Sequence, residues 1–442
     1  MILLKNFTIY IIFCIFLQLL LNEVKSQIFI KPDLRYGHTS TLIHKKLYIL
    51  GGTINGNNSS PKEAFLYIDF SVPFNTNKVT WHNLSSKDSI VPSHHLATTL
   101  AVDNTMFLFG GVSLNSYETM ASSYKFDTQS NLWKIQEING VPGKQGITSI
   151  FDESTIYLFG GYPFTYNVND MFIINSNNLS WKKANSTNSP FPRSQYGAVL
   201  LPNKFIIYMG GYNNGSIPLD QVYLYDTMND FWIIKQTSGS IPSARYSFSS
   251  ILGLDKQSVI IYGGQEDNKT IAKNPLYVLD INNFNWYIPK VTGKIPSSRT
   301  SHKAVLIGKY MSIIFEILIY NYVLKGEGYN NESEDDLLLL DISNNNEYIW
   351  TSSFTPNNNI QSNQPTSTSS SPSKTNDIQQ PNSQLNTKTN YTDVITSIII
   401  GAIIDAILLI VGIFLLYKWY KNKKEQNNAT LPNNVTLPNN AT

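Results

Sequence analysis

A short apolar run that ends in a glycine pair occurs five times along this chain of 442 residues. The pairs begin at residues 51, 110, 160, 210 and 263, so successive copies are 59, 50, 50 and 53 residues apart. Glycines that only punctuate loops would not keep this spacing. A period near 50 residues indicates tandem structural units. The pairs are Gly51 and Gly52, Gly110 and Gly111, Gly160 and Gly161, Gly210 and Gly211, and Gly263 and Gly264.

Other landmarks keep the same phase as the glycine pairs. A tryptophan follows each pair and another ends the series: Trp81, Trp133, Trp181, Trp232, Trp286 and Trp350. An acidic or amide residue stands six positions before four of them, namely Asp127, Asn175, Asp226 and Asp280. The sequence therefore contains six related units.

Each unit divides into four short apolar strands bounded by Gly, Asn, Pro or Asp. In the fourth unit these are GAVLLP, FIIYMGG, QVYLYD and DFWIIKQ. The runs are continuous rather than alternating, which is typical of strands covered on both faces. Such units stack radially into an all-β, six-bladed β-propeller. We expect the glycine pairs to permit a tight turn or a close approach, and the tryptophans to pack between blades.

The order of Arg-x-x-His, apolar strand, glycine pair, Tyr-x-x-Asp and tryptophan resembles the kelch repeat. It is clearest in RYGHTSTLIHKKLYILGG, which begins at Arg35, and in LYVLDINNFNW, which ends at Trp286. The resemblance covers residues 32–350 and implies a kelch-type β-propeller. Kelch propellers serve many functions, with one rim as the usual partner surface, so the resemblance is specific for fold rather than activity.

A proline in each unit stands three residues before a polar residue, and these polar residues are Arg35, His95, Gln145, Arg193, Arg245 and Arg299. Repeat symmetry predicts that all six face one rim or the channel mouth together. Four are arginines, whose forked N–H groups suit carboxylate, phosphate or acidic-peptide ligands. The alternative is that each arginine bonds carbonyl groups of a neighbouring blade.

The sixth unit departs from the pattern, because residues 316–325 (EILIYNYVLK) stand where a glycine pair is due. Without them, IIFGEGYNNESEDDLLLLD aligns with IIYGGQEDNKTIAKNPLYVLD. We interpret residues 316–325 as an irregular insertion, and a translated intron is one explanation for it. The sequence does not identify the strand that closes the ring, although residues 28–30 are candidates.

Apolar segments near both ends predict secretion and a membrane anchor. Residues 1–26 resemble a cleaved signal peptide, with an uncleaved signal anchor as the alternative. Residues 394–417 contain an apolar run long enough to cross a bilayer, and the lysines that follow predict a cytoplasmic tail at residues 418–442. We expect a single-pass type I protein of the plasma membrane or secretory pathway, with residues 27–350 outside or in the lumen.

One face of the predicted span carries Ser397, Gly401 and Asp405 at intervals of four residues. Small residues let helices approach closely, and an intramembrane carboxyl usually faces protein. This spacing predicts a helix–helix partner, against the alternative of a tolerated protonated aspartate.

Residues 351–393 are rich in Ser, Thr, Asn, Gln and Pro, which predicts a disordered, O-glycosylated stalk. N-glycosylation motifs also occur throughout the predicted outer part. They begin at Asn57, Asn58, Asn83, Asn178, Asn185, Asn214, Asn268, Asn331 and Asn390.

The residues do not indicate catalysis. Galactose oxidase has a kelch-type propeller, but its radical cofactor needs a cysteine, and the single cysteine here is Cys14 in the predicted signal peptide. The histidines show no metal-ligand spacing, and the acidic residues 332–336 are interpreted as a solvated turn. We expect no enzyme activity, cofactor or metal, and the net charge of +2 gives no indication of nucleic-acid binding.

These features together predict a cell-surface or secretory kelch propeller that binds a protein or a glycan. A structural or adhesive surface glycoprotein is the alternative, and a carbohydrate oxidase is a remote one.

Overall fold

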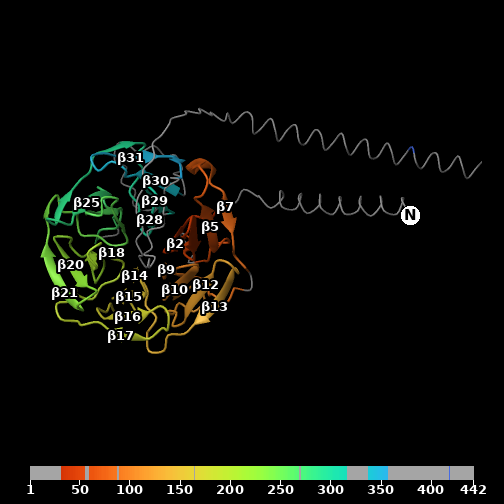
Figure 1. Cartoon of the computed structure of the whole chain (residues 1–442), viewed down its shortest axis with the longest axis horizontal. Coiled ribbons are helices and arrows are strands. Elements are labelled where there is room, and N and C mark those ends of the chain that lie inside the picture. The colour runs from red at the N-terminus through yellow and green to blue at the C-terminus, as the bar shows by residue number, and fades with distance from the viewer. Residues whose placement is uncertain are drawn as a thin grey trace, which may run out of the picture. The chain divides into compact units, whose positions relative to one another are not determined.

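The computed structural model describes residues 31–356, apart from residues 55–58, 87–88, 164, 268–269 and 316–336, together with Lys418. Within this part, six antiparallel sheets follow one another around a central axis in chain order (Figure 1). The first strand of each sheet contacts the first strands of both neighbouring sheets. The predicted all-β, six-bladed propeller is therefore confirmed.

Each blade is a contiguous stretch of chain whose four strands pair in sequence order. Blade 1 contains β2 (Thr39–Ile43), β3 (Lys46–Leu50), β5 (Phe65–Asp69) and β7 (Trp81–Asn83). Blade 2 contains β9 (Thr98–Val102), β10 (Thr105–Phe109), β12 (Ser123–Asp127) and β13 (Leu132–Gln136). Blade 3 contains β14 (Ser149–Asp152), β15 (Thr155–Phe159), β16 (Met171–Asn175) and β17 (Trp181–Lys183).

The second half of the ring repeats this arrangement. Blade 4 contains β18 (Gly197–Leu200), β19 (Phe205–Met209), β20 (Gln221–Asp226) and β21 (Phe231–Gln236). Blade 5 contains β23 (Ser249–Leu252), β24 (Ser258–Tyr262), β25 (Leu276–Asp280) and β26 (Asn285–Tyr287). Blade 6 contains β28 (Lys303–Ile307), β29 (Tyr310–Ile314), β30 (Leu337–Asp341) and β31 (Tyr348–Thr351).

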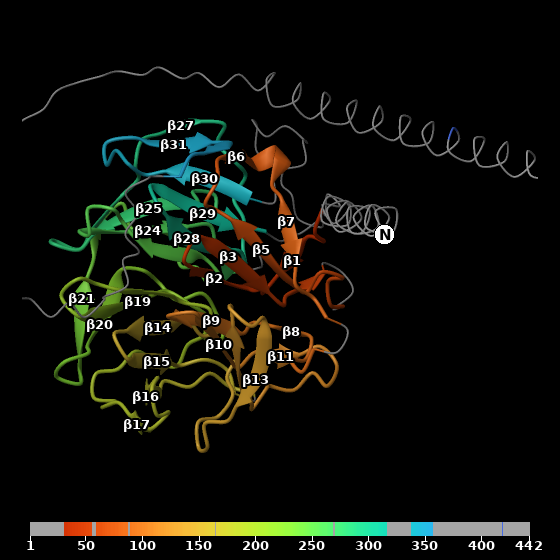
Figure 2. The same cartoon turned by 45° about the vertical axis from the view of Figure 1, so that its right-hand side comes forward.

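Short strands join the blades to one another. The linkers after blades 4 and 5 form β22 (Ser238–Gly239) and β27 (Val291–Gly293), which pair in parallel with β26 and β31 of the next blade. Two small sheets, β1 (Arg35–Tyr36) with β4 (Thr53–Ile54) and β8 (His94–His95) with β11 (Val112–Ser113), join the start of a unit to the segment after its glycine pair (Figure 2).

The ring closes between blades 6 and 1. Beyond β31, β32 (Ser353–Phe354) pairs with β6 (Phe74–Asn75), which precedes the 3-10 turn Thr76–Lys78. Phe354 is buried against Phe70, Phe74 and Tyr310. The propeller therefore extends to Phe354, so the boundary predicted after residue 350 is too early by four residues.

A closed circle of backbone hydrogen bonds, here called the backbone belt, surrounds the axis. One residue just before the first strand of each blade donates its N–H to the carbonyl of the corresponding residue in the neighbouring blade, at 2.6–3.3 Å. All six have a positive φ, between 54° and 66°, which turns the N–H and C=O groups along the circle. The belt consists of Gly37, Leu96, Gly146, Gln195, Ser247 and Ser301.

The glycine pairs are the points where one blade touches the next. The second glycine donates its N–H to the following blade, as in the 3.0 Å bond from Gly211 to the carbonyl of Arg245. A Cβ added to Gly110 would lie 1.8 Å from the carbonyl oxygen of Lys144. Because φ is also positive at all ten glycines, a side chain is excluded both by space and by conformation. The predicted close approach is confirmed.

The tryptophans pack against the preceding blade, as predicted. Trp286 of blade 5 is fully buried and donates its indole N–H to the carbonyl of Leu219 in blade 4, at 3.2 Å. Trp81 of blade 1 stacks on Phe315 of blade 6, with ring centroids 5.2 Å apart. Tryptophan packing against the preceding blade therefore occurs both between consecutive blades and where blade 1 meets blade 6.

Several predictions lie outside the described residues. They are the signal peptide (1–26), the insertion (316–325), the acidic residues 332–336, most of the stalk (351–393), the span (394–417) with its partner face, and the tail apart from Lys418. Among the residues that are described, no helix has both the length and the apolar character that a bilayer crossing requires.

Candidate functional site

The four predicted rim arginines lie inside the propeller wall. Arg35, Arg193, Arg245 and Arg299 are at most 2% exposed. Arg245 donates to the carbonyls of Gly263 and Asn274, at 3.1 and 3.0 Å, and its guanidinium lies 5.2 Å from the ring centre of Tyr277. Arg35, Arg193 and Arg245 donate to carbonyls of loops in their own blade. This agrees with the carbonyl-bonding alternative, except that the carbonyls do not belong to a neighbouring blade.

Arg193 repeats this arrangement one blade earlier. It donates to the carbonyls of Phe191 and Gly210, at 3.1 and 3.0 Å, and lies over Tyr223. Burial lowers the pKa of Arg193 to about 10, against the opposing effect of Tyr223. A guanidinium is hard to deprotonate, so it remains a cation whose donors are used internally.

The predicted equivalence of the six rim residues is wrong at two positions. The carbonyls that accept the glycine N–H groups belong to His94, Lys144, Arg193, Arg245 and Arg299. His95 and Gln145 therefore come one position later than the arginines. The cause is linker length, because one residue stands between Pro92 and His94 and between Pro142 and Lys144, whereas two stand between each proline and its arginine.

Lys144 takes the arginine position in blade 3. It is 3% exposed, forms a hydrogen-bonded ion pair with Asp170, and places its amine 4.8 Å from the ring centre of Phe172. Burial lowers the pKa of this amine, while Asp170 opposes that shift. Blades 3, 4 and 5 thus each have a buried cation that lies over an aromatic residue of the third strand. In blades 4 and 5 this aromatic residue is the tyrosine of the Tyr-x-x-Asp pattern.

The surface available to a partner is formed by loops. Because the strands are antiparallel, the loops after the second and the fourth strand of every blade lie on one side of the ring, here called the glycine-pair face. Exposed large apolar side chains on loops are concentrated there. They are Leu34, Ile90, Tyr117, Tyr166, Phe191, Tyr212, Ile241, Ile288 and Ile295, against Val72, Met228 and Leu254 on the opposite side.

Four of these side chains are aromatic and belong to consecutive blades. Tyr117, Tyr166 and Tyr212 follow the second strands of blades 2, 3 and 4, and Phe191 lies in the linker from blade 3 to blade 4. Their exposed fractions are 68%, 64%, 36% and 72%, in that order. Sequence analysis missed them because they lie outside the repeating landmarks, and aromatic residues in loops were the only available signal.

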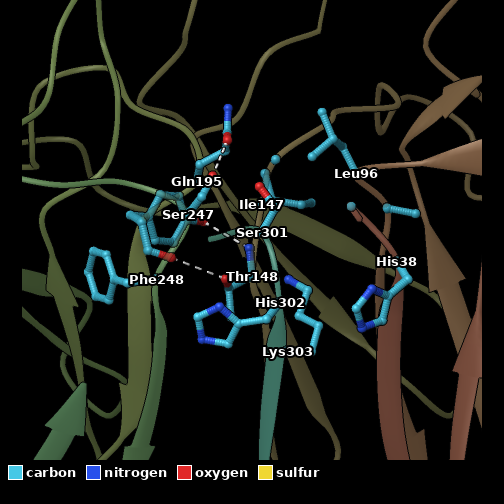
Figure 3. Close-up of a pocket in the computed structure, with 14 residues that line it drawn as sticks. His38, Leu96, Ile147, Thr148, Gln195, Ser247, Phe248, Ser301, His302 and Lys303 are labelled. Atoms are coloured by element: carbon cyan, nitrogen blue, oxygen red, sulfur yellow. Dashed lines mark hydrogen bonds between the residues drawn. The ribbon is translucent and has the colours of Figure 1, made fainter. Parts of the chain in front are cut away.

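The central channel opens at the backbone belt. A cavity of about 50 Å³ there is lined by residues from all six blades (Figure 3). Its basic side chains are His38, His302 and Lys303, and none of the described residues that line it is acidic.

The histidines do not form a metal centre in the described part of the chain. No three His, Cys, Asp or Glu side chains there are grouped closely enough to hold a metal ion. His94 is buried and its Nδ1 lies 2.7 Å from the carbonyl oxygen of Pro92, whereas His95 is partly exposed. The two adjacent rings thus have different environments, in keeping with the alternation expected along a strand.

Four of the predicted glycosylation sites are described, and all four asparagines, Asn83, Asn178, Asn185 and Asn214, are exposed. In three of them the side-chain oxygen accepts the N–H of the Ser or Thr two residues later, at 2.8–3.0 Å. Asn57, Asn58, Asn268, Asn331 and Asn390 lie outside the described residues.

The blade count, the glycine contacts and the tryptophan packing define a six-bladed propeller of kelch-type repeats. The sequence matches the family described as the KLHDC2/KLHL20/DRC7 Kelch-repeats domain over residues 37–256 and 210–371. These matches cover more than half of the chain, and the chain therefore belongs to this family.

Individual relatives are distant. The chain is 24% identical over 283 residues to Acyl-CoA-binding domain-containing protein 4 of Arabidopsis thaliana, covering 60% of this chain and 40% of that protein. It is 25% identical over 261 residues to Host cell factor 2 of Homo sapiens (53% and 32%). It is 23% identical over 295 residues to Kelch domain-containing protein 3 of Rattus norvegicus (62% and 75%). The chain thus spans less than half the length of the first two relatives.

Proposed function

We propose that this propeller is a non-catalytic module that binds a protein partner on its glycine-pair face. The observation that carries the proposal is the group of exposed aromatic side chains Tyr117, Tyr166, Phe191 and Tyr212 on blades 2 to 4. Aromatic residues are enriched at protein interfaces because they bury a large area at a low cost in side-chain entropy. The arginines are not part of this surface, since they are buried.

Photo-crosslinking from defined positions tests this proposal. A benzophenone amino acid placed at Phe191 in the full chain, expressed in its own cells, is expected to give a discrete protein adduct. The same group at Met228, an exposed position on the opposite face, is the matched control. The Phe191 adduct should be lost when Tyr166 and Tyr212 are changed to alanine. Equal adducts from both positions, or none from Phe191, would contradict the proposal.

We also propose that the propeller is displayed outside a membrane, with residues 1–26 as signal peptide, 394–417 as span and the stalk between propeller and span. Four exposed glycosylation motifs support this arrangement. The full chain should lose mass on treatment with an N-glycosidase, and Asn→Gln changes at Asn83, Asn178, Asn185 and Asn214 should each reduce that loss when their site is used. A chain without N-glycans that is released by alkaline carbonate would overturn the topology.

The partner face of the span, Ser397, Gly401 and Asp405, belongs to the same proposal. Asp405→Leu is expected to reduce self-association, or association with a basic partner helix, in membranes. Unchanged association would assign Asp405 to a tolerated protonated carboxyl.

A further inference from the structure

Among the described residues, those that line the channel cavity include basic side chains but no acidic one. Lys303 begins β28, the innermost strand of blade 6, and His302 immediately precedes it. His38 lies at the same level in blade 1. In the view of Figure 3, the Lys303 side chain lies between the two histidine rings. No carboxylate of the described residues lines the cavity that these residues share.

The Lys303 amine lacks a carboxylate partner within the described part of the chain. Its side chain is partly buried, and no hydrogen bond or ion pair to a described residue involves its Nζ. Burial lowers the pKa of Lys303, and no described carboxylate opposes that shift. Lys144 is a useful contrast, because burial lowers the pKa of its amine as well but that amine is paired with Asp170.

His38 has unused polar atoms. It is fully buried, and neither of its ring nitrogens has a hydrogen-bond partner among the described residues. His302 is 2% exposed and its ring interacts with the backbone of Tyr262. Each ring also meets an aromatic edge, His38 against Phe315 at 5.4 Å and His302 against Tyr262 at 5.5 Å. Leaving a buried polar group unpaired costs about 1–3 kcal/mol, so a ligand that satisfies the His38 nitrogens would relieve that cost.

The charges around the cavity select the sign of the ligand. Arg35, Lys303 and Arg299 all act on the neighbouring histidines as positive charges. A metal cation would be repelled by this field, whereas an anion would be attracted to it. Free hydroxyls contribute little, because Thr148 donates to the carbonyl of Tyr196 and Ser247 donates to the side chain of Gln195.

We propose that the channel entrance binds one small inorganic oxyanion, of the phosphate or sulfate class, through Lys303, His302 and His38. The cavity volume of about 50 Å³ admits a few water molecules or one such ion, and not a peptide. The site is separate from the aromatic loops on the glycine-pair face, and it does not depend on the identity of the protein partner.

The test uses the full chain in detergent or nanodiscs, with sodium phosphate and sodium sulfate as probes and sodium chloride at matched ionic strength as the reference. We expect a saturable rise in melting temperature with either oxyanion but not with chloride. Lys303→Met should weaken the apparent affinity at least tenfold. Lys273→Met, which removes an exposed lysine of blade 5, should leave it unchanged.

A second measurement does not require a folded variant. Phosphorus-31 NMR of phosphate should show exchange broadening with the wild-type chain, and excess sulfate should abolish it by competition. Absence of broadening and of a melting shift would overturn the proposal. An equal shift in wild type and Lys303→Met would also overturn it, because the ion would then act elsewhere on the surface.

Discussion

The buried Arg245 gives a sharp test of whether the repeat arginines hold the propeller together or bind ligands. Arg245→Met keeps much of the side-chain volume and removes the charge and all five donors. The carbonyls of Gly263 and Asn274, both bonded at about 3 Å, would lose their partner. The contact with Tyr277 at 5.2 Å would lose its cationic component.

The expected loss follows from these contacts. Each hydrogen bond to a charged group contributes about 1.5–3 kcal/mol, and the cation–π contact about 0.5–2 kcal/mol. Part of this is recovered because methionine carries no charge to be desolvated. We therefore expect the free energy of unfolding to fall by about 3–5 kcal/mol.

The assay is guanidinium unfolding of the wild-type and variant propellers, followed by tryptophan fluorescence. Lys273→Met, an exposed cation in the same blade, is the control and should change the unfolding free energy by less than about 0.5 kcal/mol. A loss below about 1 kcal/mol for Arg245→Met, together with lost partner binding, would refute the reasoning and return the arginine to a ligand-binding role.

Three further outcomes are expected. Gly110→Ala places a Cβ 1.8 Å from the carbonyl oxygen of Lys144 at a positive φ, so it should lower the free energy of unfolding by more than about 3 kcal/mol. Gly215→Ala should be nearly neutral, because its Cβ would meet a carboxylate oxygen of Asp267 only at an ordinary contact distance of 3.6 Å. Burial lowers the pKa of His94 from 6.5 to about 4, so the unfolded chain binds the proton first as the pH falls. Acidification from pH 7 to 5 should lower the free energy of unfolding by about 2 kcal/mol, because the unfolded chain gains a proton at His94 that the folded chain does not. His94→Gln should therefore reduce the dependence of the unfolding free energy on pH. Phe354→Ala should lower the free energy of unfolding by about 3–5 kcal/mol, because it leaves a cavity where blades 6 and 1 meet. Removal of residues beyond 356 should leave the melting temperature of the propeller unchanged.

The architecture could be predicted from the repeated residues because each of them has the same structural role in every blade where it occurs. The glycine pairs had to recur wherever one blade touches the next, and the tryptophans had to recur wherever a blade covers its predecessor. Asp127 and Asp226 recur because their carboxylates accept the N–H groups of the turn that follows the third strand. The periodic residues in the sequence are therefore those that make the same contact in each blade.

The candidate site could not be predicted in the same way. Counting from the prolines assigned His95 and Gln145 to the arginine position, because a sequence offset does not reveal a linker that is one residue shorter. The exposed aromatic residues Tyr117, Tyr166 and Phe191 lie in loops whose lengths differ from blade to blade, so no phase relation marks them. The extension to Phe354 was missed because a two-residue strand in a polar segment has no pattern of its own.

The backbone belt has a consequence for how the chain can be cut and rejoined. Five of its six links join blades that are also covalently continuous, and the sixth, from Gly37 to Ser301, joins the two ends of the propeller by the same kind of bond, at 3.3 Å. The inner circle therefore does not distinguish the place where the chain begins from any other blade boundary. Circularly permuted chains that open at another linker and join residues near 31 and 356 should assemble the same ring.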